Sequence, residues 1–251
     1  MAAWTWAAAR CRGTSHVQTG TRCQDAFAST STPDGALVAV LCDGAGSAEL
    51  GGQGASIVAR LISVRARLHL KCTSNFPDDE TIWSWIDEAR DAISHAGKLR
   101  DRRSRDFAAT LLCVLSNGAQ TLVVHVGDGC AVAKTSRLEE WIPLTWPAHG
   151  EYASSTYFVT DDPAPKAVIT RHVEPVSAIV AFTDGIERLA LDFAKEMPHS
   201  PFFEAIAAPV IRSSELGRDR QLSSQLAAYL DSEKVNERTD DDKTILIAAF
   251  R

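Results

Sequence analysis

The sequence of 251 residues contains only six cysteines, and no two of them form a C-x-x-C pair. They are spread along the chain as Cys11, Cys23, Cys42, Cys72, Cys113 and Cys130. Zinc sites and small disulfide-stapled scaffolds both need cysteines at short, regular spacings, so neither class of protein fits. We therefore expect reduced thiols and a cytoplasmic location.

Long hydrophobic runs and an excess of positive charge are also missing. The longest apolar runs, such as Leu37–Cys42 and Ala178–Phe182, are far shorter than the roughly 20 residues of a membrane span. The apolar start, Met1–Arg10, lacks a basic region and a cleavage site, which predicts a first strand rather than a signal peptide. The net charge of -6 argues against nucleic acid, anionic membranes and acidic partners in general.

Several common catalytic motifs are absent. The glycine-rich stretch 43–54 has Glu49 at the third glycine position of a dinucleotide loop, and no Lys-Ser or Lys-Thr follows it as in a P-loop. No G-x-S-x-G elbow and no H-E-x-x-H pattern occurs. Among the histidines, His125 lies in an apolar run that predicts a core position, whereas His16 and His149 lie in polar, glycine-bearing segments that could face a site.

Hydrophobic periodicity predicts a mixed α and β chain, and without a linker we expect one domain, 1–251. Four predicted helices cover Ala55–Leu70, Gly185–Ala190, Phe202–Ala208 and Gln221–Leu230. A fifth is predicted to begin at the capping residues Asp78–Thr81 and to end near Gly97. Predicted strands after the first are Leu37–Cys42, Ala108–Leu115, Thr121–Val126, Cys130–Lys134, Leu138–Ile142, Val168–Ile169, Ala178–Phe182 and Thr244–Phe250. The stretch Trp146–Lys166 predicts a loop or flap over a site, and Arg100–Asp106 a solvated helix end.

Aspartates recur where the predicted strands begin or end. They are Asp43, Asp128, Asp184 and the run Asp240–Asp242, with Asp25 before a further apolar position. Any one of them is explained by the preference of aspartate for turns. If they converge, however, the negative cluster is stable only with bound cations, and oxygen ligands select Mg²⁺ or Mn²⁺. The Gly44 carbonyl, beside Asp43, is a further candidate ligand.

Six short motifs occur in an order that resembles the metal-dependent serine/threonine protein phosphatases of type 2C, in particular their compact bacterial branch. They are Gly13–His16 with Cys23–Phe27, Asp43–Gly46, Phe107–Leu112, His125–Gly129, Phe182–Ile186 and Asp241–Thr244. The resemblance implies an α+β fold, a four-layer α-β-β-α sandwich of two antiparallel sheets flanked by helices. It also implies a metal cluster in a cleft at one edge of the sandwich.

The resemblance further implies the roles of the site residues. Asp43 would bridge two Mn²⁺ or Mg²⁺ ions, with the Gly44 carbonyl on one and Asp184 and Asp241 on the other, while Asp128 and Asp184 would hold a third. Asp25 would bind an ion or orient one of its ligands. The implied catalytic set is therefore Asp25, Asp43, Asp184 and Asp241. The implied reaction is hydrolysis of phosphoserine or phosphothreonine in a protein, opposing a kinase, by a water that two ions activate and without a covalent intermediate.

Three positions depart from the pattern of this family. Gln24 stands where many members have a glutamate ligand, Gly20 where they have a phosphate-binding arginine, and Ala45 where many have a histidine. Arg22 or His16 could replace the arginine as substrate-binding residues. The departures favour an alternative, a pseudophosphatase that acts as a binding or regulatory module. A phosphoesterase for small molecules or nucleic acid uses the same cluster, but the acidic composition predicts no basic groove.

Overall fold

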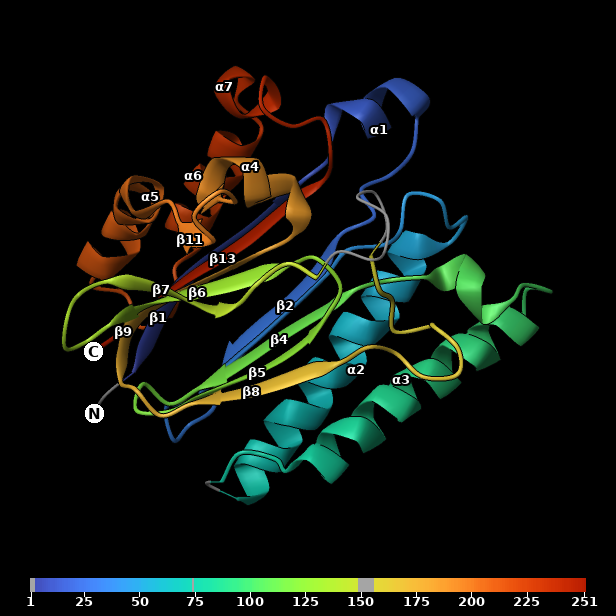
Figure 1. The fold of residues 1–251 in the computed structure, drawn as a ribbon, viewed down its shortest axis with the longest axis horizontal. Helices are drawn as coiled ribbons and strands as arrows, with labels where there is room; N and C mark the ends of the chain where they lie inside the picture. Colours follow the sequence, from blue (N-terminus) through green and yellow to red (C-terminus); the bar gives the residue numbers. More distant parts are fainter. Residues whose placement is uncertain (1–2, 74, 149–155) are drawn as a thin grey trace.

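The computed structural model describes residues 3–73, 75–148 and 156–251. Two large β-sheets pack face to face, with helices on the outer side of each, so the four-layer α+β fold expected from the sequence is confirmed (Figure 1). The strand orders are β12-β1-β13-β9-β6-β7 and β2-β3-β4-β5-β8. All neighbouring strands in the two sheets are antiparallel except β1 and β12, which form a short parallel pair.

The six-stranded sheet brings together both ends of the chain. Ala3 and Arg251 exchange two backbone hydrogen bonds of 2.8 and 3.1 Å, which places the termini side by side (Figure 1). Its strands are β1 (Trp4–Cys11), β6 (Cys130–Thr135), β7 (Trp141–Thr145), β9 (Val176–Phe182), β12 (Gly217–Arg218) and β13 (Lys243–Phe250).

The five-stranded sheet is built from the middle of the chain. Its strands are β2 (Ala26–Ser31), β3 (Leu37–Cys42), β4 (Leu111–Ser116), β5 (Thr121–Val126) and β8 (Val168–His172). All six residues of β3 are buried, because this strand is covered by the second sheet on one face and by helices on the other. That double burial explains its uninterrupted apolar run. A separate two-stranded ribbon joins β10 (Leu191–Asp192) to β11 (Met197–Pro198).

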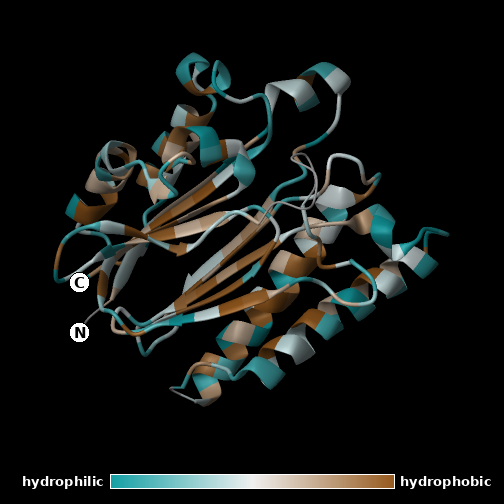
Figure 2. Ribbon diagram, viewed as in Figure 1, coloured by the Kyte–Doolittle hydropathy of each residue, from teal (hydrophilic) through white to brown (hydrophobic). Residues whose placement is uncertain are grey.

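Two helix pairs complete the outer layers. Helices α2 (Gly51–Cys72) and α3 (Asp79–Lys98) cover the five-stranded sheet, and α5 (Ser200–Arg212) and α6 (Arg220–Leu230) cover the other. Hydrophobic stripes run along the sheet-facing sides of the helices, with hydrophilic residues outside (Figure 2). The short helical elements are α1 (Thr14–Thr19), η1 (Ser104–Phe107), η2 (Asp184–Ile186), α4 (Glu187–Ala190) and α7 (Glu233–Asn236).

Some element boundaries differ from the sequence-based predictions. Helix α1 was not predicted, because none of its residues is buried and it therefore shows no hydrophobic periodicity. Helix α2 begins at Gly51 rather than Ala55, since its glycines permit a close approach to neighbouring backbone. The predicted strand 108–115 begins at Leu111, and the strand predicted at 138–142 is displaced to 141–145.

The remaining predicted segments are placed as follows. Residues 146–148 and 156–166 form no helix or strand, whereas 149–155, with His149, lie outside the described residues. The predicted helix end at 100–106 instead follows the end of α3, and Arg102 pairs there with Glu49 at 2.9 Å. His125 is buried as predicted, with its Nδ1 2.8 Å from the Thr145 hydroxyl. Within the described part of the chain, no helix is long and apolar enough to cross a membrane.

Candidate metal centre

Asp43 and Gly44 leave the sandwich at the end of the buried strand β3. The Asp43 N–H donates to the Thr110 hydroxyl at 2.9 Å, and the Thr110 N–H donates to the Asp43 carbonyl at 2.8 Å. A second backbone bond joins Ala45 to Ala108, so Gly44 sits in a β-bridge whose two hydrogen bonds do not use its own carbonyl. A Cβ on Gly44 would lie 2.2 Å from the Gly51 backbone, which explains why glycine is needed here.

Two further aspartates reach the same place from other elements. Asp128 lies in the turn between β5 and β6, after Gly127 with its φ of +110°, and Asp184 begins η2 directly after β9. Each of Asp43, Asp128 and Asp184 offers a carboxylate oxygen, and these three oxygens all lie within 4.8 Å of one another. The structure therefore brings together three aspartates that lie far apart in the sequence.

The proximity of these carboxylates is electrostatically unfavourable without a counter-charge. Burial, followed by the charges of Asp25 and Asp184, holds the pKa of Asp43 well above its usual range. The pKa of Asp184 is likewise raised by burial and by the charges of Asp128 and Asp241. Bound divalent cations would remove this penalty, and the oxygen-only donor set with the adjacent Gly44 carbonyl fits Mg²⁺ or Mn²⁺.

Asp25 lies deeper than the three clustered aspartates, just before β2. Its Oδ2 accepts hydrogen bonds from the hydroxyls of Thr183, at 2.9 Å, and Thr244, at 2.6 Å. Its Oδ1 is buried and faces no N–H or hydroxyl donor among the described residues, and the carboxyl group lies against that of Asp43. Burial raises the pKa of Asp25 to about 6, although a hydrogen bond with Asp43 and hydrogen bonds from Thr244 and Thr183 oppose this shift. The two threonines thus hold the carboxylate in one orientation beside Asp43.

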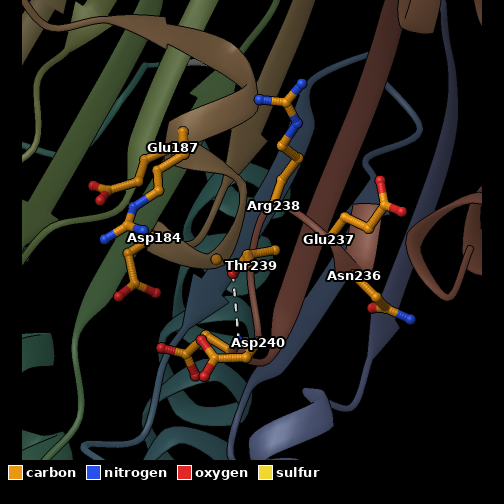
Figure 3. A pocket seen from close by; sticks show the side chains of 10 residues that line it. Asp184, Glu187, Asn236, Glu237, Arg238, Thr239 and Asp240 are labelled. Atoms are coloured by element: carbon orange, nitrogen blue, oxygen red, sulfur yellow. Dashed lines mark hydrogen bonds between the residues drawn. The ribbon is translucent and has the colours of Figure 1, made fainter. Parts of the chain in front are cut away.

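Asp241 lies at the mouth of the centre rather than within the 4.8 Å group. It lines a pocket of about 300 Å³ together with Asp184. Figure 3 shows Asp184 and Glu187 on one wall of this pocket and Arg238 and Thr239 on the other. Arg188 also lines the pocket, whereas the Arg238 side chain extends away from Asp184 and Asp240 in Figure 3.

The two predicted substrate-binding residues are placed differently. His16 lies on α1, with its Nδ1 3.0 Å from a carboxylate oxygen of Asp242. Arg22 is exposed in the segment between α1 and β2, and no ion pair joins it to a described carboxylate. Neither side chain lines the pocket that contains Asp184 and Asp241.

Sequence reasoning assigned no supporting role to several residues that lie in its own motifs. Asp242 is buried, and it accepts hydrogen bonds from the backbone N–H groups of Gly13, at 2.6 Å, and Gln24, at 2.5 Å. It thereby fastens the segment before Asp25 to the start of β13. The role of Thr183 and Thr244, which hold Asp25, was not predicted either. Their only sequence signal is a position beside a predicted ligand, Asp184 in one case and the Asp240–Asp242 run in the other.

Comparison with known proteins decides the family. A family model described as Protein phosphatase 2C matches residues 12–231. The chain belongs to this family. The predicted membership, and with it the prediction of a protein phosphatase, is confirmed.

Individual relatives of this phosphatase cover almost its whole length. Serine/threonine-protein phosphatase 3 of Escherichia coli (strain K12) is 32% identical over 256 residues, which are 98% of this chain and 98% of the relative. The catalytic domain of the phosphatase PstP, solved with two manganese ions, superposes with a TM-score of 0.64 at 16% identity and covers 100% of this chain and 99% of its own. RsbX, solved with magnesium, gives 0.57 at 14% identity, with 97% and 94% covered.

Proposed function

We propose that this phosphatase hydrolyses phosphoserine and phosphothreonine in proteins with two Mn²⁺ or Mg²⁺ ions, and with a third at Asp128. The observation that carries the proposal is the convergence of Asp43, Asp128 and Asp184 within 4.8 Å. The relative from Escherichia coli is named for serine and threonine substrates, and the solved PstP and RsbX hold manganese and magnesium. These names and metals match the oxygen-only donor set found in this chain.

Each aspartate has a distinct part in the proposed reaction. When bound, the ions lower the pKa of a water and offset charge on the phosphoryl oxygens. Asp43 and the Gly44 carbonyl would hold the ions at the end of β3, with Asp128 from the β5–β6 turn, Asp184 after β9 and Asp241 before β13. Asp25, which Thr183 and Thr244 hold by hydrogen bonds, would orient the neighbouring aspartates from the interior side of the centre.

The phosphate group needs a positive partner in this mechanism. Gly20 supplies none, and Arg22 and His16 do not line the pocket beside Asp184. Arg188 lines it beside Asp184, so we assign the binding of the substrate phosphate to this arginine in the first place. Arg22 and His16 remain candidates for contacts with the rest of the substrate.

One observation favours the alternative function of a catalytically weak binding module. Gln24 is buried, and its Nε2 lies 3.4 Å from the Ala48 carbonyl, so the neutral amide adds no negative charge to the centre. The same fold could then bind phosphorylated segments with little turnover.

The deciding experiment measures hydrolysis of para-nitrophenyl phosphate and of a phosphothreonine peptide with Mn²⁺, with Mg²⁺ or with a chelator. We expect metal-dependent turnover that Asp43→Asn and Asp184→Asn reduce by about a hundredfold or more. Asp34→Asn, which changes an exposed turn residue in the same way, is the matched control and should keep full activity. Folded protein without turnover in either metal would reject the enzyme and leave the binding module.

Three further assignments accompany this function. The six free cysteines support the proposed cytoplasmic location. We also propose that 1–251 is one phosphatase domain, since strands from both ends of the chain share a sheet. The substrates would be phosphoproteins made by a serine/threonine kinase.

A further inference from the structure

Four arginines line a groove at the side of the sandwich where β12 and β2 are the outermost strands. A hollow of about 470 Å³ is lined by Arg10, Arg218 and Arg220, and a neighbouring hollow of about 440 Å³ by Arg10 and Arg60. Both hollows share Arg10 and Phe27, so they form one continuous groove from α6 to α2. We refer to it as the arginine groove.

The positive charge of the arginine groove is not neutralised by the protein. All four arginines are exposed, and no carboxylate lines either hollow within the described part of the chain. Ion pairs within 4.0 Å join other basic residues to described carboxylates, but none involves these four. Glu215 and Asp219 line an adjoining hollow that shares Arg218 and Arg220 with the groove, and neither forms an ion pair with them within 4.0 Å.

Two of the arginines are held in place by contacts other than ion pairs. Arg10 donates to the Asp25 carbonyl at 2.7 Å, and Arg218 donates to the Ala8 carbonyl at 3.3 Å while lying 5.6 Å from the Phe27 ring centre. Arg60, on α2, and Arg220, at the start of α6, lie at the two ends of the groove and form no ion pair with a described carboxylate. Although the chain as a whole carries a charge of -6, these four arginines form a local concentration of positive charge.

We propose that the arginine groove docks an acidic segment of a partner polypeptide. Guanidinium groups bind carboxylates through paired hydrogen bonds, and four of them in a row suit a run of Asp and Glu side chains. Strand β2 has a neighbouring strand on one side only, so its backbone can pair with an extended chain. Nucleic acid fits less well, because Phe27 is the only aromatic residue lining the two hollows and Arg218 lies over its ring.

The position of the groove links docking to the metal centre. Strand β2 begins at the residue after Asp25, and Arg10 contacts the Asp25 backbone. An acidic segment docked along β2 would therefore tether a phosphorylated residue near the centre and raise its local concentration. This link rests on the proposed phosphatase function, whereas docking itself does not.

The test measures binding of a fluorescein-labelled ten-residue peptide of alternating Asp and Glu, by anisotropy, to the full chain in EDTA. The chelator prevents the peptide from binding through metal ions. We expect Arg60→Glu with Arg220→Glu to weaken binding by about tenfold or more. The matched control, Arg105→Glu with Arg137→Glu, makes the same charge change at exposed arginines outside the groove and should retain the affinity.

Further measurements make the result decisive. The neutral pair Arg60→Gln with Arg220→Gln should weaken binding less than the charge reversal, and turnover of para-nitrophenyl phosphate with Mn²⁺ should stay unchanged in every variant. The proposal is overturned if the wild-type chain does not bind the peptide, if both charge-reversed pairs weaken it equally, or if a single-stranded DNA of equal charge displaces it more strongly. Loss of turnover in every protein, with peptide binding retained, would count against the phosphatase function and still support docking.

Discussion

At the scale of single residues, the centre depends on how Asp25 is held. Its Oδ2 is bound by two hydroxyls, those of Thr183 and Thr244, and the Thr244 N–H in turn donates to the Thr183 hydroxyl at 3.0 Å. Such a network fixes a buried carboxylate only while each of its members is satisfied. The two threonines therefore position a residue of the centre without belonging to the clustered aspartates.

Thr244→Val should destabilise the protein by about 1–3 kcal/mol, because valine keeps the shape and removes one donor from a buried acceptor. Urea unfolding in EDTA measures this change. Thr30→Val is the control, since the Thr30 hydroxyl contacts only the neighbouring Ser31 carbonyl at 3.3 Å and should matter by less than about 0.5 kcal/mol. Equal effects of the two substitutions would refute the role given to Thr244.

The raised pKa of Asp25 predicts a pH dependence of stability without metal. The pKa rises from 3.8 to about 6 on folding, so the folded state binds the proton more tightly, and the stabilisation by protonated Asp25 is lost as pH rises through this window. Burial lowers the pKa of His125 from 6.5 to about 4, which acts in the opposite direction. The pH dependence of wild-type stability must therefore be compared with that of Asp25→Asn.

Between pH 4.5 and 7, the unfolding free energy of wild type should fall relative to that of Asp25→Asn by about 2 kcal/mol. Urea titrations in EDTA at several pH values give this difference. The contribution of His125 cancels because both proteins contain it, whereas Asp43 and Asp184 add to the difference because the Asp25 charge raises their pKa values. A difference that does not change with pH would show that Asp25 ionises normally.

At the scale of elements, the position of α2 depends on close backbone contacts that its glycines permit. A Cβ on Gly54 would lie 1.9 Å from the Phe107 carbonyl oxygen, and one on Gly51 would lie 2.7 Å from the Ala45 carbonyl oxygen. The start of α2 is therefore pressed against the segments that carry Asp43 and Gly44. Its glycines hold the helix in place and are not the phosphate loop that a glycine-rich stretch can indicate.

Gly54→Ala should destabilise the protein by about 1–3 kcal/mol, even though alanine favours a helix, because the methyl group meets backbone that cannot move independently. Gly46→Ala is a control in the same glycine-rich stretch, since a Cβ there meets no atom within 4 Å. Urea unfolding compares the two. If Gly54→Ala were as stable as Gly46→Ala, the close approach of α2 to η1 would be wrong.

At the scale of the whole molecule, cation binding should control stability. With Mn²⁺ at about a hundred times its Kd, the gain is about 2.7 kcal/mol, or a rise in Tm of about 5–10 °C for a chain of this size. Asp43→Asn with Asp184→Asn should raise the Tm in EDTA, by removing repulsion, and abolish the further rise with Mn²⁺. Differential scanning calorimetry with and without Mn²⁺ measures both effects.

Asp34→Asn should behave like wild type in this experiment, because Asp34 is exposed and lies outside the centre. A Mn²⁺-dependent rise that survives in the double variant would place the cation elsewhere in the molecule.

The sequence by itself determined the features that depend on local order along the chain. The sequence predicted the apolar run of β3, the hydrophobic periodicity of α2 and α3, and the Asp-Gly pairs after strands. It could do so because burial on one or two faces produces a periodic pattern of apolar residues. The ordered motifs also indicated the family and the aspartates of the centre. Helix α1 and the start of α2 were missed, since neither leaves a hydrophobic stripe.

Only the tertiary structure decided which of these residues meet. Asp43, Asp128 and Asp184 lie far apart in the sequence, and they converge because β3, the β5–β6 turn and β9 end on the same side of the sandwich. The supports Asp242, Thr183 and Thr244 are likewise defined by contacts between distant strands. The net charge predicted no basic groove, yet folding gathers Arg10, Arg60, Arg218 and Arg220 at one edge, because a total charge says nothing about position.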